Sequence, residues 1–255
     1  MKKARLTFLG TGTSQGVPMI GCGCEVCRSS DHRDKRLRSS VVVDYDGLKL
    51  LVDAGPDFRQ QMLREDVSHL DAILLTHNHK DHTGGLDDIR AFNYLEKRAT
   101  EIYCEPYVEE SLRLEYGYAF AEKKYPGAPE WNVNNIDDKP FRIGSTEIIP
   151  IRGRHYKLPV LGYRFGNIAY CTDMNHIPEE EFAKLQNLDH FIINCVRYGR
   201  HISHFSLEGA VETALKVGAK HSWLTHLSHQ LPRHAVLEKE LPPGILPAYD
   251  GLVLE

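Results

Sequence analysis

Thr76-His77-Asn78-His79-Lys80-Asp81-His82-Thr83-Gly84-Gly85 is the most informative stretch of this sequence, with three imidazoles and one carboxylate within six residues. The apolar run at residues 72–75 directly before it predicts a buried strand. Alternate side chains of extended chain share a face, so we expect His77 and His79 to point the same way. Asp81 and His82 follow at the turn before a predicted helix over residues 86–95. Nitrogen and oxygen ligands at this density suit a pair of catalytic divalent cations better than a solvated polar loop.

Three further candidate ligands lie at the ends of later predicted strands. His155 follows the strand-like residues 147–151, Asp173 ends residues 168–172, and His226 ends residues 222–225. A lone histidine is more often structural than a ligand, so it is the joint spacing that favours metal binding.

With these motifs in this order, the chain resembles the metallo-β-lactamase superfamily. The resemblance implies an α/β fold, an αββα four-layer sandwich with the metals at the sheet edge. It also implies a dinuclear site in which Asp173 bridges the two cations. The other ligands would divide into two sets, one of His77, His79 and His155, the other of Asp81, His82 and His226. Ligands of these types bind manganese, zinc or iron. Of these metals, we name manganese and zinc as the candidates for the catalytic pair.

A second cluster, Cys22, Cys24 and Cys27, forms a C-x-C-x-x-C pattern in a glycine-rich loop. Three thiolates this close suit zinc but need a fourth ligand, and free buried thiols or an oxidised pair are the alternatives. The chain is similar to the phosphoribosyl cyclic phosphate phosphodiesterase branch of the superfamily, and that similarity implies His229 as the fourth ligand of a structural zinc. The similarity runs nearly end to end, through Gly10-Thr11-Gly12, His155-Tyr156-Lys157-Leu158, His204-Phe205-Ser206-Leu207 and Tyr249-Asp250-Gly251.

Two catalytic residues and one substrate-binding residue complete the expected site. The resemblance implies that His204, between a predicted strand and a predicted helix, protonates the leaving alkoxide, a contribution of typically about 10²–10⁴-fold. A histidine at a helix N-terminus without catalytic duty is the alternative. Asp81 is expected to serve in catalysis as well as in metal binding. Lys157 is a candidate for binding a non-reacting phosphate of the substrate through its point charge. An exposed lysine with no role in binding is the alternative.

The composition predicts one cytoplasmic enzyme domain over residues 1–255. With 255 residues, 42% hydrophobic and 26% charged, the chain is long enough for one full core. Single cysteines in apolar runs are typical of a reducing compartment, and no run is long enough to span a membrane. Residues 115–140 are rich in aromatic rings and form a possible cap over the active site, with an ordinary satellite core as the alternative.

The predicted elements alternate strands and helices in two halves. Strands are expected at residues 6–9, 40–45, 49–52, 72–76, 101–104, 143–151, 161–165, 167–171, 191–196, 222–225 and 252–254, and helices at residues 58–64, 86–95, 207–217 and 234–240.

These features together predict a metal-dependent hydrolase of small phosphodiesters, with cyclic ribose phosphates or 2′,3′-cyclic nucleotides as the expected substrates. A tRNA 3′-processing nuclease would need a basic arm, whereas the chain has a net charge of -4 and balanced charges at residues 115–140. We therefore expect no stable nucleic-acid partner. Thioester hydrolases of this fold usually carry a C-terminal helical region, and little chain remains here for one. Lactone hydrolases share the fold and are a further alternative. A non-enzymatic metal-binding module would require a degraded ligand set, and all seven ligands are present.

Overall fold

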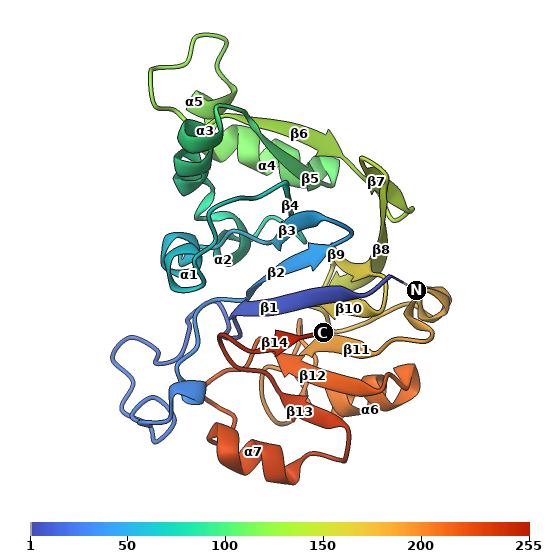
Figure 1. Ribbon diagram of the computed structural model, residues 1–255. Coiled ribbons are helices and arrows are strands. Elements are labelled where there is room, and N and C mark those ends of the chain that lie inside the picture. The colour runs from blue at the N-terminus through green and yellow to red at the C-terminus, as the bar shows by residue number, and fades with distance from the viewer. Residues whose placement is uncertain (1) are drawn as a thin grey trace.

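Two seven-stranded sheets face each other in the computed structural model, which describes residues 2–255 (Figure 1). Helices cover the outer face of each sheet, so the molecule has the four αββα layers that were expected. The first sheet has the order β14-β1-β2-β3-β4-β5-β6 and the second the order β13-β12-β11-β10-β9-β8-β7. The strands of the first sheet are β1 (Ala4–Gly10), β2 (Ser40–Tyr45), β3 (Leu48–Val52), β4 (Ala72–Leu74), β5 (Thr100–Cys104), β6 (Trp131–Asn135) and β14 (Val253–Leu254).

The second sheet and the helices complete the architecture. The strands of that sheet are β7 (Phe141–Ile143), β8 (Thr146–His155), β9 (Leu158–Phe165), β10 (Ile168–Cys171), β11 (His190–Asn194), β12 (His221–Thr225) and β13 (Ile245–Pro247). The helices are α1 (Phe58–Arg64), α2 (Lys80–Thr83), α3 (Arg90–Glu96), α4 (Pro106–Glu115), α5 (Gly117–Phe120), α6 (Leu207–Val217) and α7 (His234–Glu240). Three 3₁₀ turns lie at His32–Asp34, Leu86–Ile89 and Glu179–Leu185.

Side-chain alternation along the strands builds three apolar layers. On β2, Val41 and Val43 point into the core between the sheets, while Val42 points into the core under the helices of the first sheet. A third core lies between the second sheet and α6 and α7. Strands buried on both faces read as continuous apolar runs, which explains the uninterrupted valines of β2.

Parallel pairing gathers the strand ends at one edge. Strands β3 to β6 pair in parallel, and so do β10 to β13. Carboxyl ends of parallel strands lie at the same edge of a sheet, which is where ligands bind in open α/β sheets. The residues that follow β3, β4, β10 and β12 are therefore brought together between the two sheets.

The chain ends lie side by side because β14 pairs antiparallel with β1 (Figure 1). Leu254 is opposite Leu6, and Val253 is opposite Thr7. No helix within residues 2–255 is long and apolar enough to cross a membrane.

Several predicted elements differ from the structure in their details. The expected strand at residues 143–151 is a hairpin of β7 and β8, since Gly144 adopts a φ of 58° and reverses the chain. Residues 86–95 begin as a 3₁₀ turn before α3, and the strand expected at residues 72–76 ends at Leu74. Strand β13 was not predicted, because it has only three residues, the last of them Pro247, and they carry no alternation.

Residues 115–140 contain structural elements of the main fold. Residues 131–135 are β6, the edge strand of the first sheet, and α5 follows α4 directly. Tyr116 and Trp131 are buried in the outer core of that sheet with their rings 5.5 Å apart, edge to face. These two rings match the satellite-core alternative, and a cap stays a prediction for the remaining loop.

Candidate metal centre

Asp173 lies at the centre of a histidine cluster between the two sheets. It follows β10, and its carboxylate is buried. Its Oδ1 atom is 2.9 Å from His226 Nε2 and 3.1 Å from His204 Nδ1. Its Oδ2 atom contacts His82 Nε2 and lies 3.9 Å from His77 Nε2. The carboxylate therefore has a histidine on each side, as a bridging ligand requires.

The remaining candidate ligands surround this centre. Asp81 Oδ2 is 3.3 Å from His82 Nε2. The ring of His79 lies 4.6 Å from that of His77 and 5.0 Å from that of His155, measured between centroids. The structure thus brings together all seven side chains that the sequence singled out.

Three sets of donor atoms have the spacing of metal ligands, each within 4.8 Å. Asp173 belongs to all three. The sets are His77, His82 and Asp173; Asp81, Asp173 and His226; and His155, Asp173 and His204.

The buried polar atoms of the cluster lack other partners. His77 Nε2, His82 Nε2 and both oxygens of Asp173 are buried without a well-formed hydrogen bond. Buried polar atoms in proteins almost always have a partner, so convergent orphans of this kind fit bound cations. Histidine nitrogens and carboxylate oxygens are the ligands that zinc and manganese accept. The donor set therefore fits a pair of divalent metal ions.

Electrostatics at the centre favours positive charge. Burial disfavours the ionised carboxylate of Asp173, yet His226 and His82 hold its pKa well below the ordinary value. Burial likewise opposes a charged His82 ring, but Asp173 and Asp53 raise the pKa of that imidazole well above its usual value. Burial and the nearby His82 together lower the pKa of His77, so its ring stays neutral. A divalent cation requires ionised carboxylates and neutral imidazoles, so its binding would displace the proton that Asp173 and Asp53 favour on His82.

Side chains behind the cluster orient the rings of His82 and His77. His82 Nδ1 donates to Asp53 Oδ2 at 2.6 Å, and His77 Nδ1 donates to Thr76 Oγ1 at 2.9 Å. Thr76 Oγ1 donates in turn to Asp53. With Nδ1 occupied, each ring presents Nε2 to the centre of the site, the arrangement that fixes the tautomer of metal-binding histidines.

Ser39 plays the same part for His226. His226 Nδ1 donates to Ser39 Oγ at 3.1 Å, and that hydroxyl donates to the carbonyl of Gly12 at 2.9 Å. The Gly10-Thr11-Gly12 turn therefore lies beneath the metal site. The backbone of Arg38 lies so close to Gly10 that no side chain fits there, because a Cβ on Gly10 would lie 1.9 Å from the Arg38 carbonyl oxygen.

Backbone strain marks the same strand ends. Asp53, Asp173 and His226 adopt φ values of 64°, 54° and 55°, in the left-handed region that non-glycine residues rarely enter. Such conformations concentrate at functional sites, where the surrounding structure maintains them. Each of the three residues follows a strand whose carboxyl end lies at the site.

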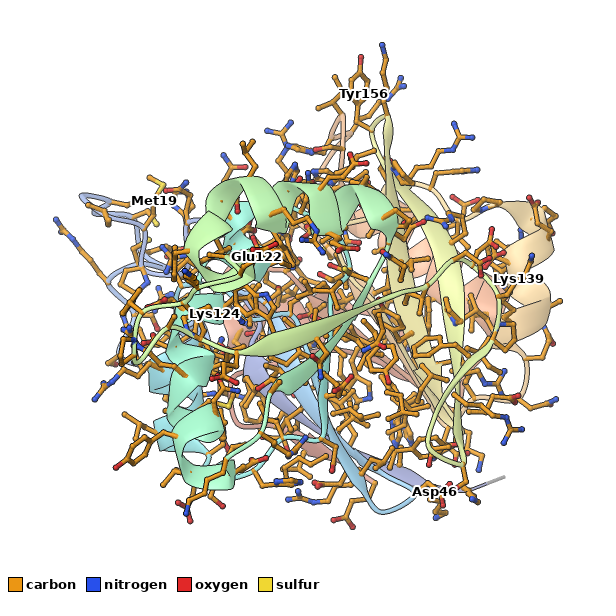
Figure 2. The ribbon with its side chains drawn as sticks, turned by 90° about the horizontal axis from the view of Figure 1, so that it is seen from above. Met19, Asp46, Glu122, Lys124, Lys139 and Tyr156 are labelled. Atoms are coloured by element: carbon orange, nitrogen blue, oxygen red, sulfur yellow. The ribbon has the colours of Figure 1, made fainter. Side chains whose placement is uncertain are left out.

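His204 and Lys157 lie on the open side of the cluster. His204 comes between β11 and α6, and its Nδ1 faces Asp173. Lys157 is exposed at the tip of the β8–β9 hairpin, where its neighbour Tyr156 stands clear of the molecule (Figure 2). It shares a surface hollow with His79 and His155.

The cysteine cluster closes with His229. Its Nδ1 atom lies 3.3 Å from Cys22 Sγ and 3.5 Å from Cys24 Sγ, and Cys27 completes a four-ligand set within 4.8 Å. The Cys27 amide lowers the pKa of the Cys24 thiol to about 6, whereas burial raises that of Cys27 to about 11. Four such donors fit a tetrahedral zinc ion.

The family of the chain follows from comparison with known proteins. A model described as a beta-lactamase superfamily domain matches residues 49–227, a range that runs from β3 through His226. The chain belongs to the metallo-β-lactamase superfamily.

Individual relatives of this superfamily member differ in their described activities. A solved structure of "a New Diphosphatase from the PhnP Family" is 40% identical, with a TM-score of 0.92, and the match covers 98% of this chain and 96% of that one. A Porphyromonas gingivalis protein named octanoyltransferase is 43% identical over 251 residues, which are 97% of this chain and 51% of that protein. This chain thus spans about half the length of that relative. Zinc-bound PqqB from Methylobacterium extorquens shares the fold at 19% identity and a TM-score of 0.78, over 98% of this chain and 99% of that one.

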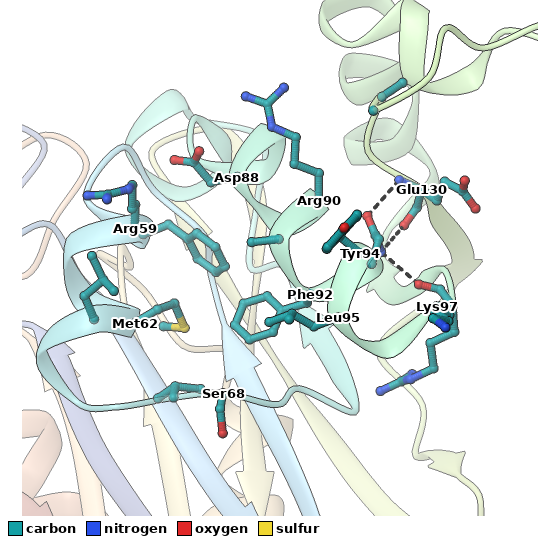
Figure 3. Close-up of a pocket in the computed structure, with 18 of the residues that line it drawn as sticks. Arg59, Met62, Ser68, Asp88, Arg90, Phe92, Tyr94, Leu95, Lys97 and Glu130 are labelled. Carbon is teal, nitrogen blue, oxygen red and sulfur yellow. Dashed lines mark hydrogen bonds between the residues drawn. The ribbon is translucent and has the colours of Figure 1, made fainter.

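An apolar cavity of this metallo-β-lactamase domain lies apart from the metal centre. It has a volume of about 900 Å³ and opens between α1 and α3, with Met62, Phe92 and Leu95 among its lining residues (Figure 3). It contains none of the candidate ligands, so it contributes nothing to the chemistry at Asp173.

Sequence reasoning missed Ser39, Asp53 and Thr76. Asp53 directly follows β3, which is the pattern that identified Asp173 after β10, so a signal was present. Ser39 and Thr76 carry no comparable signal, since small hydroxyl residues are common at strand ends.

Proposed function

We propose that this superfamily member is a dinuclear metal-dependent phosphodiesterase that hydrolyses small phosphodiesters. The observation that carries the proposal is the cluster of six nitrogen and oxygen ligands around a seventh, Asp173, with a further histidine, His204, at the open side. The catalytic cations would be manganese or zinc, and one structural zinc would bind Cys22, Cys24, Cys27 and His229.

The candidate ligands divide between two positions. His77, His79 and His155 would hold one cation, and Asp81, His82 and His226 the other, with Asp173 between them. When bound, two divalent cations supply Lewis acidity that neutralises phosphoryl charge and makes water a stronger nucleophile. The chain holds these side chains in place through Ser39, Asp53 and Thr76.

His204 would act as the general acid. Its Nδ1 faces Asp173, which leaves Nε2 as the ring nitrogen that can donate a proton to the leaving oxygen. A sugar alkoxide leaves poorly without a proton, so this donation matters most for ribose esters. Asp81 would accept a hydrogen bond from the attacking water in addition to ligating metal.

Cyclic ribose phosphates and 2′,3′-cyclic nucleotides remain the substrates we propose. The 40% identical diphosphatase supports phosphate chemistry at this site. The octanoyltransferase name belongs to a protein about twice as long, and we extend no acyl transfer to this chain. None of the six cysteines is paired in a disulfide, which supports a cytoplasmic location.

Turnover by the metal-stripped protein after metal is restored tests the proposal. Manganese and zinc are added separately, and cyclic ribose phosphates, 2′,3′-cyclic nucleotides and linear diesters are offered with each. We expect metal-dependent release of a phosphomonoester. The proposal would be overturned if no phosphodiester is hydrolysed and a thioester or lactone is. Salt-sensitive retention of the protein on immobilised RNA would favour a nuclease.

His204→Ala tests the general acid. Its kcat on a cyclic ribose phosphate is expected to fall about 10²–10⁴-fold, with a much smaller loss on an aryl phosphodiester whose phenolate leaves unaided. Equal losses on both substrates would make His204 a positioning residue.

A further inference from the structure

Asp250 is a buried carboxylate that the chemistry at Asp173 does not use. It comes shortly before β14, and only 7% of its side chain is exposed. Its Oδ1 atom accepts from the Thr11 hydroxyl at 2.7 Å, and its Oδ2 atom accepts from the Leu37 amide at 2.8 Å. Burial raises the pKa of Asp250, and the hydrogen bonds from Leu37 and Thr11 counter that effect. One side chain thus joins residues that lie 239 and 213 positions away in the sequence.

Thr11 connects this carboxylate to the backbone of a candidate metal ligand. Thr11 is fully buried, and its carbonyl accepts from the amide of Leu227, the residue after His226, at 2.8 Å. Arg36 donates to the Thr11 hydroxyl at 2.9 Å and to the Ala248 carbonyl at 2.6 Å. The hydroxyl therefore donates one hydrogen bond and accepts another, so its side chain cannot rotate without leaving a buried polar group unsatisfied.

The second contact of Asp250 leads to the residue that orients the His226 ring. The Leu37 carbonyl accepts from the Gly12 amide at 2.8 Å. Two residues further along the chain, the Ser39 hydroxyl donates to the Gly12 carbonyl and accepts from His226 Nδ1. Asp250 therefore contacts both of the segments that meet at the hydrogen bond between His226 and Ser39.

We propose that Asp250, through its hydrogen bond with Thr11, is a positioning residue for the metal ligand His226. The pair would keep the backbone of His226 at the distance from Ser39 that the ring hydrogen bond requires, so that Nε2 stays directed at its cation. The inference rests on the dinuclear centre of the proposed function, and it holds for any reaction that this centre performs.

Thr11→Val tests the pair with a side chain of almost the same shape. Valine has no hydroxyl, so Asp250 Oδ1 loses its donor while the volume of the side chain is kept. Thr146→Val is the matched control, because Thr146 is also buried and also donates to an aspartate, Asp46, at the opposite end of β8 from His155. Thr11→Ser keeps the hydroxyl and should behave as the wild type.

The first measurement follows the His226 ring in the full chain after the catalytic cations have been removed. NMR of protein with isotope-labelled histidine reports how fast the Nδ1 proton of His226 exchanges with water, and His226→Asn identifies its signal. We expect exchange about 5–10-fold faster in Thr11→Val than in Thr146→Val, because a hydrogen bond between less firmly held partners opens more often. Equal exchange rates in these two variants would overturn the proposal.

Asp250→Asn approaches the pair from its other member. The amide has a single oxygen, so the donors of Thr11 and Leu37 can no longer both be satisfied. Exchange in the double variant with Thr11→Val should be slower than the two single effects predict together, since both changes remove the same hydrogen bond. Additive effects would contradict the pair. If Asp250→Asn fails to fold, the comparison of Thr11→Val with Thr146→Val still decides.

Manganese binding tests the consequence for the metal centre. Titration of Mn²⁺ followed by electron paramagnetic resonance distinguishes a coupled pair of ions from a single ion. In Thr11→Val we expect one ion to bind about 10–100-fold more weakly than in Thr146→Val, and the other ion to stay within about 2-fold. The second ion should be spared because its ligands, His77, His79 and His155, lie at the ends of β4 and β8.

The manganese titration also separates this inference from the proposed function. Equal weakening of both ions in Thr11→Val, or of neither, would overturn the role of Asp250. Absence of a coupled pair from the wild-type protein would contradict the proposed dinuclear function alone, since the exchange measurement on His226 requires no metal.

Discussion

At the scale of single residues, the site depends on hydrogen bonds that hold imidazole rings in one orientation. Asp53 is central to this network, because its buried carboxylate accepts from His82 Nδ1 and from both the amide and the hydroxyl of Thr76. Burial raises the pKa of Asp53, and the nearby His82 counters that effect. The carboxylate thus links the end of β3 to two candidate ligands after β4, to His82 directly and to His77 through Thr76.

Asp53→Asn tests this network with a side chain of the same shape. The amide is a weaker acceptor and also carries donors, so His82 would be held less firmly in the tautomer that presents Nε2. We expect metal affinity at the catalytic site to fall about 10–100-fold, measured by competition with a chelator. Asp88→Asn, far from the ligands at the rim of the apolar cavity, is the control. Wild-type affinity in Asp53→Asn would show that ring orientation is set by packing alone.

The sequence identified candidate ligands better than the residues that hold them. His77, His79 and Asp81 are recognisable because their types and spacing are unusual after an apolar strand. Ser39 matters because it contacts His226, which depends on how the two sheets meet, and Thr76 matters through its contact with Asp53 after the neighbouring strand. Their contribution became visible only with the three-dimensional contacts.

At the scale of elements, two loops fix each other through their backbones. The Ala54 amide donates to the His82 carbonyl, and the Gly85 amide donates to the Ala54 carbonyl, both at 2.8 Å. A Cβ on Gly55 would lie 2.0 Å from the Asp81 carbonyl oxygen. The loop after β3 therefore sits directly against the loop that carries Asp81 and His82.

Gly55→Ala should separate these loops. The clash involves backbone atoms of Asp81, so the ligand loop must move, and we expect about 1–3 kcal/mol lower stability together with reduced catalytic metal content. Denaturant unfolding and elemental analysis measure the two effects. Gly117→Ala adds a methyl group where no atom lies within 4 Å, and it should change neither. Normal metal content in Gly55→Ala would show that the loop tolerates the shift.

Element boundaries were predictable where periodicity and turns agree. The helices at residues 58–64, 207–217 and 234–240 match α1, α6 and α7 at both ends. For α6 the reason is visible, since Ser206 caps its first turn and Gly218 ends it in a left-handed conformation. The β7–β8 hairpin was missed because β7 has only three residues, too few to show a strand pattern of its own before the turn at Gly144.

At the scale of the whole molecule, the cysteine cluster joins distant parts of the chain. Cys22 and His229 are 207 residues apart in sequence, and His229 comes three residues after His226. A zinc ion there would restrict the unfolded chain and fix the backbone beside a catalytic ligand.

Cys24→Ser should therefore affect a site that it does not touch. We expect a lower melting temperature, measured by calorimetric unfolding. We also expect about 10–100-fold weaker metal binding at the catalytic centre, measured by chelator competition. Cys104→Ser, in a strand away from both clusters, controls for the loss of a thiol. Full catalytic metal content after loss of the structural zinc alone would rule out this coupling.

The overall architecture was predictable through the resemblance, whereas strand pairing was not. The position of β14 at the outer edge of the first sheet, beyond β1, depends on a long-range contact that local sequence does not encode.

That pairing has a consequence for biosynthesis. A ribosome releases the chain from its N-terminal side, so β1 has no β14 beside it until residues 253–254 have left the exit tunnel. His226 and His229 also emerge late, after every other candidate ligand. The catalytic cluster can therefore be completed only after His226 has emerged and the cysteine cluster only after His229, so full ligand sets exist only once most of this domain has been made.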